Sequence, residues 1–204
     1  MRQAIIFIIG VAILQVNLSC KAQYSVSELK DNFSTEQISD LNKITNFFKN
    51  QICLNMDSDF KTCYERIPHE YLDATGNGFW TNIDFEKQKE LYKQISKSTF
   101  ENIWMFCKST EYKTGKETKS LCANTIGKYY IYLSDLGKQN PKIAKYAEKV
   151  RASGDFNVLD IQYWNIQKDK KHFDLNNPNT QLFLAIHYLS LNDQKKRKEE
   201  WITE

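Results

Sequence analysis

Residues 182–191, with the sequence LFLAIHYLSL, decide the fold of this chain. The segment is apolar almost all round, and the pair Asn177-Pro178 before it predicts a helix start, with an N-cap residue followed by proline at the first helical position. A helix without a polar face has to be surrounded by other elements. We therefore expect this helix at the centre of a bundle, with His187 as a buried, hydrogen-bonded structural histidine.

The rest of the chain supports a helical fold. Seven glycines and three prolines in 204 residues interrupt it rarely, and charged residues make up 26%. This composition favours long helices over a many-stranded sheet. Apolar spacings of three and four, together with capping residues, predict helices over residues 35–52, 57–64, 83–96, 98–107, 121–136 and 141–152.

Two segments between these helices are less regular. Residues 108–119 are polar and predict a loop, whereas residues 156–166 fit either a helix or a strand. We assign 156–166 to a helix because no second strand is visible to pair with it. The sequence thus predicts an all-α fold, a single helical-bundle domain over residues 20–204, with a charged end that frays from about residue 194.

The N-terminal residues predict export. A basic Arg2 is followed by an apolar run over residues 4–14 and then by small and polar residues up to Gln23. This order is typical of a secretory signal peptide, since a run of about eleven residues is too short for a bilayer that needs ~20. We therefore expect the mature protein to work outside the cytoplasm.

The end of the signal resembles a known processing site. Leu18-Ser19-Cys20 is similar to the lipobox of bacterial lipoproteins, although Asn17 stands where that pattern has a large aliphatic residue. The resemblance implies that residues 1–19 are removed and that Cys20 receives lipid, which would anchor the protein to a membrane of the cell envelope. The alternative is cleavage after Ala22, which would give a secreted or periplasmic protein.

The remaining cysteines predict two disulfide bonds. Cys53, Cys63, Cys107 and Cys122 form an even set in an oxidising compartment. Of the three possible pairings we favour Cys53 with Cys63 and Cys107 with Cys122, because both are local. A zinc site would want Cys-x-x-Cys pairs or nearby histidines, and the sequence has neither.

Catalytic motifs are not found in the sequence. It has no G-x-S-x-G elbow, phosphate-binding loop or dinucleotide fingerprint, and His69-Glu70 lacks the second histidine of H-E-x-x-H. We therefore assign no catalytic residue, and calcium is the one candidate cofactor. Nucleic acid is not an expected partner, since the protein is exported and its pI of about 8.4 is modest.

One loop resembles the calcium loop of an EF-hand. Residues 73–84, DATGNGFWTNID, have Gly78 at the required sixth position. The resemblance implies calcium ligation, at positions 1, 3, 5, 7, 9 and 12, by Asp73, Thr75, Asn77, the carbonyl of Phe79, Thr81 and Asp84. Only two of these residues are carboxylates, so binding would be weak and structural. A plain Asn-Gly turn between helices accounts for the same residues.

A basic helix face is the second candidate surface. Lys142, Lys145 and Lys149 share one face of the predicted 141–152 helix and could meet anionic headgroups or an acidic protein. The same stripe also fits the solvated side of an amphipathic helix.

Trp80 follows the glycine-rich turn, and we expect it and Phe79 to be partly exposed.

These observations favour one function over two alternatives. We expect an exported, lipid-anchored helical binding or interaction module of the bacterial cell envelope. The sequence does not name its ligand, and an envelope or extracellular protein is one candidate partner. The alternatives are an enzyme acting on an envelope polymer and a weak calcium-binding structural module.

Overall fold

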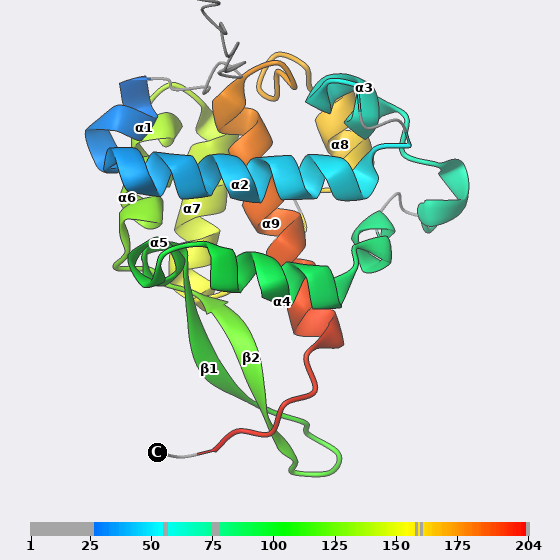
Figure 1. The fold of residues 1–204 in the computed structure, drawn as a ribbon, viewed down its shortest axis with the longest axis vertical. Helices are drawn as coiled ribbons and strands as arrows, with labels where there is room; N and C mark the ends of the chain where they lie inside the picture. Colours follow the sequence, from blue (N-terminus) through cyan, green and yellow to red (C-terminus); the bar gives the residue numbers. More distant parts are fainter. Residues whose placement is uncertain (1–26, 55–56, 75–77, 158, 160, 203–204) are drawn as a thin grey trace, which may run out of the picture.

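The computed structural model describes residues 27–54, 57–74, 78–157, 159 and 161–202. It is mostly helical, with one two-stranded sheet that projects from the helical body (Figure 1). The elements in chain order are α1 (Ser27–Asn32), α2 (Thr35–Ile52), α3 (Phe60–Glu65), η1 (His69–Tyr71), η2 (Phe79–Asn82), α4 (Phe85–Gln94), α5 (Lys97–Ile103), β1 (Trp104–Thr110), β2 (Glu117–Ala123), α6 (Lys128–Gly137), α7 (Pro141–Ser153), α8 (Tyr163–Lys168) and α9 (Pro178–Lys196).

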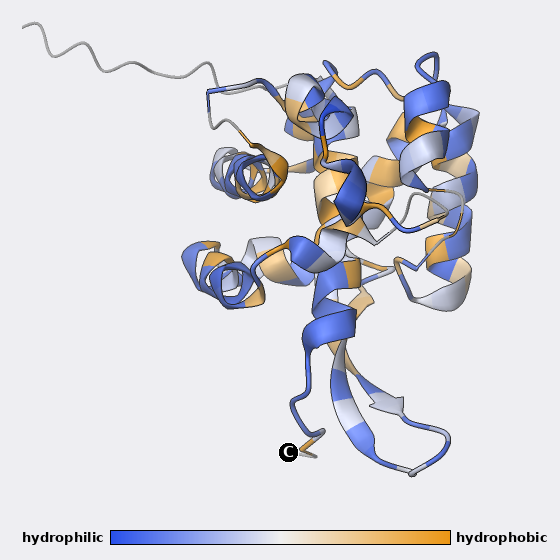
Figure 2. Cartoon of the chain, turned by 90° about the vertical axis from the view of Figure 1, so that its right-hand side faces the viewer, coloured by the Kyte–Doolittle hydropathy of each residue, from blue (hydrophilic) through white to orange (hydrophobic). Residues whose placement is uncertain are grey.

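The central position of α9 is confirmed. All residues from Leu182 to Ser190 are buried, and Asn177 caps the helix by accepting a hydrogen bond from the N–H of Asn179 at 2.8 Å. Helices α2 and α4 cross in front of α9 in Figure 1, and both contact it. Figure 2 shows that hydrophobic residues gather where the helices face one another. Burial of these faces is the main driving force for the fold.

The helix α2 follows its prediction in its bounds, its cap and its apolar stripe, whereas Asp40, expected on the water-facing side, is buried. Ser34 and Gln37 form the expected capping box, each side chain accepting a hydrogen bond from the backbone N–H of the other. The predicted apolar stripe is buried, and it consists of Ile38, Leu41, Ile44, Phe48 and Ile52. The helix α7 is likewise confirmed, with Asn140 as N-cap and Gly154 in the left-handed conformation, φ 68°, after its last turn.

The prediction of a purely helical fold is wrong in one region. The helix predicted over 98–107 ends at Ile103, and residues 104–110 form β1 instead. Residues 117–123 form β2, so the predicted polar loop is a hairpin and the helix predicted from 121 begins only at Lys128. Aromatic and β-branched residues in 104–110 favour an extended chain, and a cross-strand disulfide holds the pair together.

Two further boundaries differ from the prediction. Asp59, rather than Asp57 or Ser58, caps the helix α3. The ambiguous residues 156–166 give a helix only from Tyr163, in the short α8. Helix propensity decides little in such short segments, because tertiary contacts determine where a single turn begins.

The C-terminal residues are held against the body. The sequence predicts fraying from about residue 194, but α9 continues to Lys196 and residues 199–201 then run beside β2. The guanidinium of Arg197 pairs with Asp193, which fixes this end of the chain.

Among the described residues, no helix combines the length and the apolar character that crossing a membrane requires.

Candidate functional site

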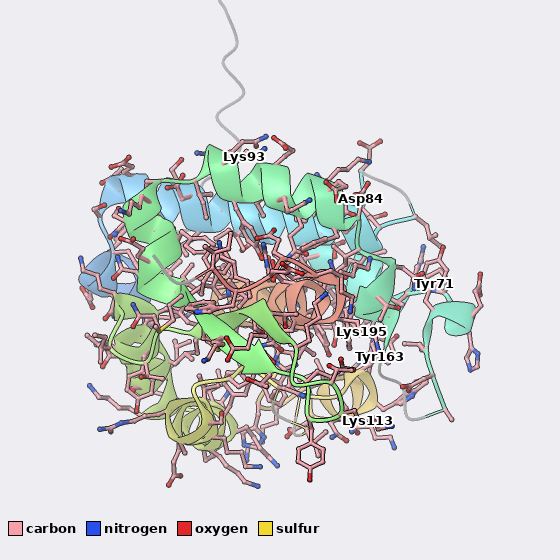
Figure 3. The ribbon with its side chains drawn as sticks, turned by 90° about the horizontal axis from the view of Figure 1, so that it is seen from below. Tyr71, Asp84, Lys93, Lys113, Tyr163 and Lys195 are labelled. Atoms are coloured by element: carbon pink, nitrogen blue, oxygen red, sulfur yellow. A yellow bond between two sulfur atoms is a disulfide. The ribbon has the colours of Figure 1, made fainter. Side chains whose placement is uncertain are left out.

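One element projects from the helical body: the hairpin formed by β1, β2 and the loop 111–116 between them, which we call the arm. It is antiparallel, with Trp104 opposite Ala123 at its base and Thr110 opposite Glu117 near its tip. The arm extends beyond the helical body in Figures 1 and 2, and Figure 3 shows it from below, with Lys113 on its loop. Tyr112, in the same loop, is 100% exposed. Such an aromatic side chain is available to a partner.

The disulfide bonds that the sequence predicts are confirmed. Cys53 is joined to Cys63 with a Cα–Cα distance of 4.6 Å, and Cys107 to Cys122 with 5.9 Å. The second bond crosses the arm, where Cys107 lies opposite Ser120 and Cys122 opposite Met105. It therefore links residues two pairs apart in the ladder and fixes the register of the two strands.

The base of the arm is anchored in the core. The indole of Trp104 is fully buried, and its Nε1 donates a hydrogen bond to the Oγ of Ser190 on α9 at 2.8 Å. The rings of Phe100 and Tyr92 lie 5.5 and 5.4 Å from the Trp104 ring. A buried aromatic group with its polar atom satisfied is a strong anchor. The arm is therefore rooted in the helical body at Trp104.

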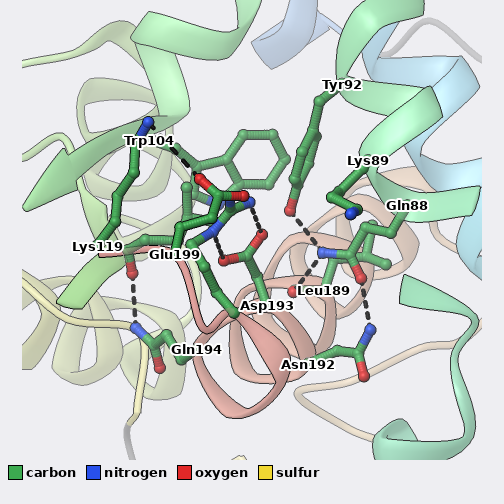
Figure 4. A network of polar contacts seen from close by, with 12 residues as sticks. Gln88, Lys89, Tyr92, Trp104, Lys119, Leu189, Asn192, Asp193, Gln194 and Glu199 are labelled. Carbon is green, nitrogen blue, oxygen red and sulfur yellow. Dashed lines mark hydrogen bonds and ion pairs between the residues drawn. The ribbon is translucent and has the colours of Figure 1, made fainter. Parts of the chain in front are cut away.

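A buried ion pair fixes the chain that follows α9. The Nε of Arg197 donates to the Oδ1 of Asp193 at 2.7 Å and its Nη2 to Oδ2 at 2.6 Å, while its Nη1 donates to Glu199 at 2.5 Å (Figure 4). The guanidinium also lies 4.8 Å from the ring of Phe106 on β1. Burial raises the pKa of the Asp193 carboxyl, although the Arg197 charge opposes this shift. The pair ties the end of α9 to the base of the arm.

Residues 198–202, which we call the tail, cover one edge of the arm. The N–H of Lys119 donates to the carbonyl of Glu199 at 2.8 Å, and the N–H of Trp201 donates to the carbonyl of Glu117 at 3.3 Å. The Nζ of Lys119 lies 3.8 Å from the Glu199 carboxylate. The tail thus acts as a short third strand on β2.

A network of amide side chains joins α4 to α9 near the base of the arm. The Nε2 of Gln88 on α4 donates to the hydroxyl of Tyr92 at 2.5 Å and to the carbonyl of Leu189 at 2.8 Å, and its Oε1 accepts from the Nδ2 of Asn192 at 2.7 Å (Figure 4). Gln88 and Asn192 are fully buried. This network fixes α4 on α9 and belongs to the scaffold of the arm.

A second surface feature is a groove of about 780 Å³ between α2, residues 57–60 and the start of α9. Its walls include amide side chains, among them Asn42, Asn46 and Gln181. Within the described residues the Nδ2 of Asn42 is buried without a hydrogen-bond partner. Asp59, also in the wall, accepts two hydrogen bonds from Thr62 in capping α3.

The residues of the predicted calcium loop are held in other contacts where the structure describes them; Thr75 and Asn77 lie outside the described residues. The carbonyl of Phe79 accepts a hydrogen bond from Asn82 at 3.2 Å, and the hydroxyl of Thr81 donates to the carbonyl of Gly78 at 2.7 Å. Asp84 caps α4 through the N–H of Lys87 at 3.1 Å. Asp73 belongs to the chain just before the gap. Calcium binding stays a prediction.

The exposure predicted for Phe79 is wrong. Its side chain is only 2% exposed, because it packs in an aromatic cluster 4.5 Å from Tyr188. Trp80 is half-buried against the core.

The residues Lys142, Lys145 and Lys149 all lie on the exposed face of α7, and the Nζ of Lys142 is 4.0 Å from Asp169. Cys20 lies outside the described residues, so its lipidation also stays a prediction.

The histidines do not meet at one site. His187 is buried, with its Nδ1 3.1 Å from the hydroxyl of Tyr146, and burial lowers its pKa to about 3. His172 pairs with Asp169 at 2.7 Å, three residues before it on the same loop. In the part of the chain that the structure describes, no three His, Cys, Asp or Glu side chains gather as metal ligands would.

Sequence reasoning missed the arm. A signal was present, since Thr114-Gly115-Lys116 is a turn between residues 104–110, which include two aromatic residues and a cysteine, and residues 117–123, which include a second cysteine; Gly115 has φ +67°. The pairing of Cys107 with Cys122 also suits two neighbouring strands.

Compared with known proteins, the chain matches no family model, no curated protein and no solved structure.

Proposed function

We propose that this protein is an exported, lipid-anchored module of the bacterial cell envelope that binds a protein partner through its arm. The observation that carries the proposal is that the arm both projects from the helical body and is held rigidly. The arm stands out from the helical body, yet a disulfide, a buried tryptophan and a buried ion pair all fix it in place. A rigid element in its binding conformation loses little entropy when a partner associates.

The chemistry of the arm suits a protein surface. Tyr112 at the tip and Met105 near the base, which is 49% exposed, provide apolar contact. Between them lie hydroxyl side chains and lysines that can form hydrogen bonds and ion pairs. Aromatic and methionine side chains with a polar rim are the usual composition of protein interfaces.

The position of α1 supports an anchored orientation. Described residues begin at Ser27 in α1, which lies at the end of the molecule away from the arm (Figure 1). Six residues lie between Cys20 and Ser27, so a lipid on Cys20 would keep α1 within about 25 Å of the membrane. The arm would then point away from that membrane, toward partners in the surrounding space.

The experiment compares two tyrosines in living cells. A photo-crosslinking amino acid replaces Tyr112 on the arm or Tyr71, which is 42% exposed in η1 away from the arm. We expect irradiation to give one discrete protein adduct from position 112 and none from position 71. The same preparation gives the intact mass, which should show an acylated chain that begins at Cys20. Equal or absent crosslinking at both positions would contradict the arm as the contact surface, and a soluble chain that begins at Gln23 would contradict the anchor.

A further inference from the structure

We infer that the outer edge of β1 is a strand-addition site, which accepts an extended segment of the partner that carries a carboxylate near Lys108. This inference rests on the proposed function, because it names the way in which the arm would bind. Its evidence is the direction of the backbone groups in the arm, which the contacts of the tail reveal.

The contacts of the tail show which backbone groups point outward. In an antiparallel strand, the N–H and C=O of one residue face one neighbour and those of the next residue face the other. Lys119 and Glu117 on β2 direct their backbone groups to the tail. Their partners in the register are Lys108 and Thr110, so these residues, and Phe106 by the same alternation, point their N–H and C=O groups away from β2.

The two edges of the arm therefore differ. The tail pairs with the β2 edge. Within the described residues, no hydrogen bond reaches the outward N–H or C=O groups of Phe106, Lys108 and Thr110. An uncovered strand edge is a template for another strand, and peptide-binding domains use it in this way.

The edge is already in the conformation that an added strand needs. The disulfide fixes the register of β1, and Trp104, its first residue, is anchored in the core. Just beyond its last residue, the N–H of Glu111 donates a hydrogen bond to the carbonyl of Lys116 at 2.9 Å and closes the hairpin. An added segment could form up to about six backbone hydrogen bonds with the three outward residues, two for each.

The charges of the arm identify the segment. On this face of the arm Lys108 lies directly opposite Lys119, and a glutamate offsets each charge: Glu117 of β2 lies 2.7 Å from Lys108, and Glu199 of the tail lies 3.8 Å from Lys119. β1 itself contains no acidic residue, so a strand added at its edge continues this pattern when it presents a carboxylate to Lys108. The opposite face of β1 carries Met105 and Ser109, which favour uncharged partner residues.

A second copy of this chain is a poorer occupant. In the antiparallel register centred on Lys108, two copies would place their Lys108–Lys119 pairs side by side, so that four lysines stand in one row, and like charges directly opposite are unfavourable. Contact along one seven-residue strand also buries much less than the ~1,200 Å² of a stable interface. An extended segment that wraps a single edge is the better match.

The test uses purified protein and two synthetic peptides. Both are capped nine-residue peptides that alternate threonine and valine, with glutamate at the centre of one and lysine at the centre of the other. Binding is followed by amide NMR shifts. Lys108→Pro removes an outward N–H without removing a hydrogen bond to β2, and proline is tolerated on such edges. Lys108→Thr is the matched control, since it keeps the N–H and removes only the charge.

The expected result is saturable binding of the glutamate peptide, with shifts concentrated at the amides of Phe106, Lys108 and Thr110. Lys108→Pro should weaken it at least tenfold, whereas Lys108→Thr should keep binding but lose the preference for glutamate over lysine. Unchanged amide shifts in α7 show that the variant is folded. If Lys108→Pro does not fold, Thr110→Pro takes its place. Failure of both peptides to bind at millimolar concentration, or binding that Lys108→Pro leaves intact, would overturn strand addition. Crosslinking from position 112 in cells would then still stand, so the two proposals fail separately.

Discussion

Arg197 and Asp193 form a two-pronged ion pair in the interior, with N–O distances of 2.7 and 2.6 Å and side chains only 4% and 0% exposed. The pair closes the end of α9, and the same guanidinium contacts Phe106 on β1 and Glu199 at the start of the tail. One side chain thus connects the central helix, the arm and the third strand. The stability of the body and the order of the arm should therefore depend on each other.

Loss of this arginine should destabilise the protein strongly. Arg197→Met leaves the Asp193 carboxylate buried without its partner, and such changes cost about 3–5 kcal/mol. Urea unfolding should show a loss of this size at neutral pH, while Arg151→Met, which removes an exposed arginine, should stay close to wild type. The double variant Asp193→Leu with Arg197→Met should recover part of the loss, because no unpaired charge remains. A single variant as stable as wild type would contradict the role of the pair.

The disulfide of the arm should matter locally. Cys107→Ser with Cys122→Ser opens a loop that spans 15 residues, which the chain-entropy model values at about 3 kcal/mol. Hydrogen exchange should become faster throughout β1 and β2 and change little in α7. The matched pair Cys53→Ser with Cys63→Ser should leave exchange in the arm unchanged. Faster exchange in the arm for both double variants would show that the two regions are not separate.

Much of this helical body could be predicted because its signals are local. The caps Ser34, Asn140 and Asn177 each lie next to a regular apolar pattern, and the helices that follow them are as expected. The arm could not be predicted in this way. Its strands gain their hydrogen bonds from residues across the turn, and β1 continues an apolar helix pattern through Ile103 and Trp104.

The position of the tail also could not be predicted from the local sequence. A charged end such as residues 194–204 normally predicts fraying, and nothing in the local sequence reveals that Arg197 is buried against Asp193. Arg197 is buried because it contacts Phe85 of α4, Asp193 of α9 and Phe106 of β1. The candidate binding edge is a consequence of that arrangement, since the tail covers β2 and leaves β1.

Acid should destabilise the protein through His187. Its folded pKa of about 3 lies below the ordinary value near 6.5, because burial disfavours the charged ring. Between these two values the unfolded chain binds more protons, so stability is full above pH 6.5 and falls by about 1.4 kcal/mol per pH unit as the pH decreases. We expect His187→Gln to reduce the loss between pH 7 and pH 4.5, measured by urea unfolding. His69→Gln, at an exposed site, should follow wild type; equal slopes for all three proteins would contradict this assignment.

The calcium prediction can be tested with the half-buried Trp80 as a probe. If the 73–84 loop binds calcium, titration should change the tryptophan fluorescence with a dissociation constant of about 10⁻⁴ to 10⁻³ M, because the only carboxylates among its ligands are those of Asp73 and Asp84. Asp73→Ala should abolish the change, while Asp31→Ala, an exposed acidic residue of α1, should not. Absence of any calcium-dependent change in fluorescence or melting temperature at several millimolar would reduce the loop to an ordinary turn.

The most direct test of the arm as the interaction surface is amide hydrogen exchange of the protein isolated from the cell envelope in mild detergent. The reference is the same preparation after a high-salt wash has removed bound proteins. We predict slower exchange in the envelope preparation for residues 104–116, with no difference in α7 or in residues 78–84. Protection of the Lys142, Lys145 and Lys149 face or of the Trp80 loop, with the arm unchanged, would contradict the proposed function.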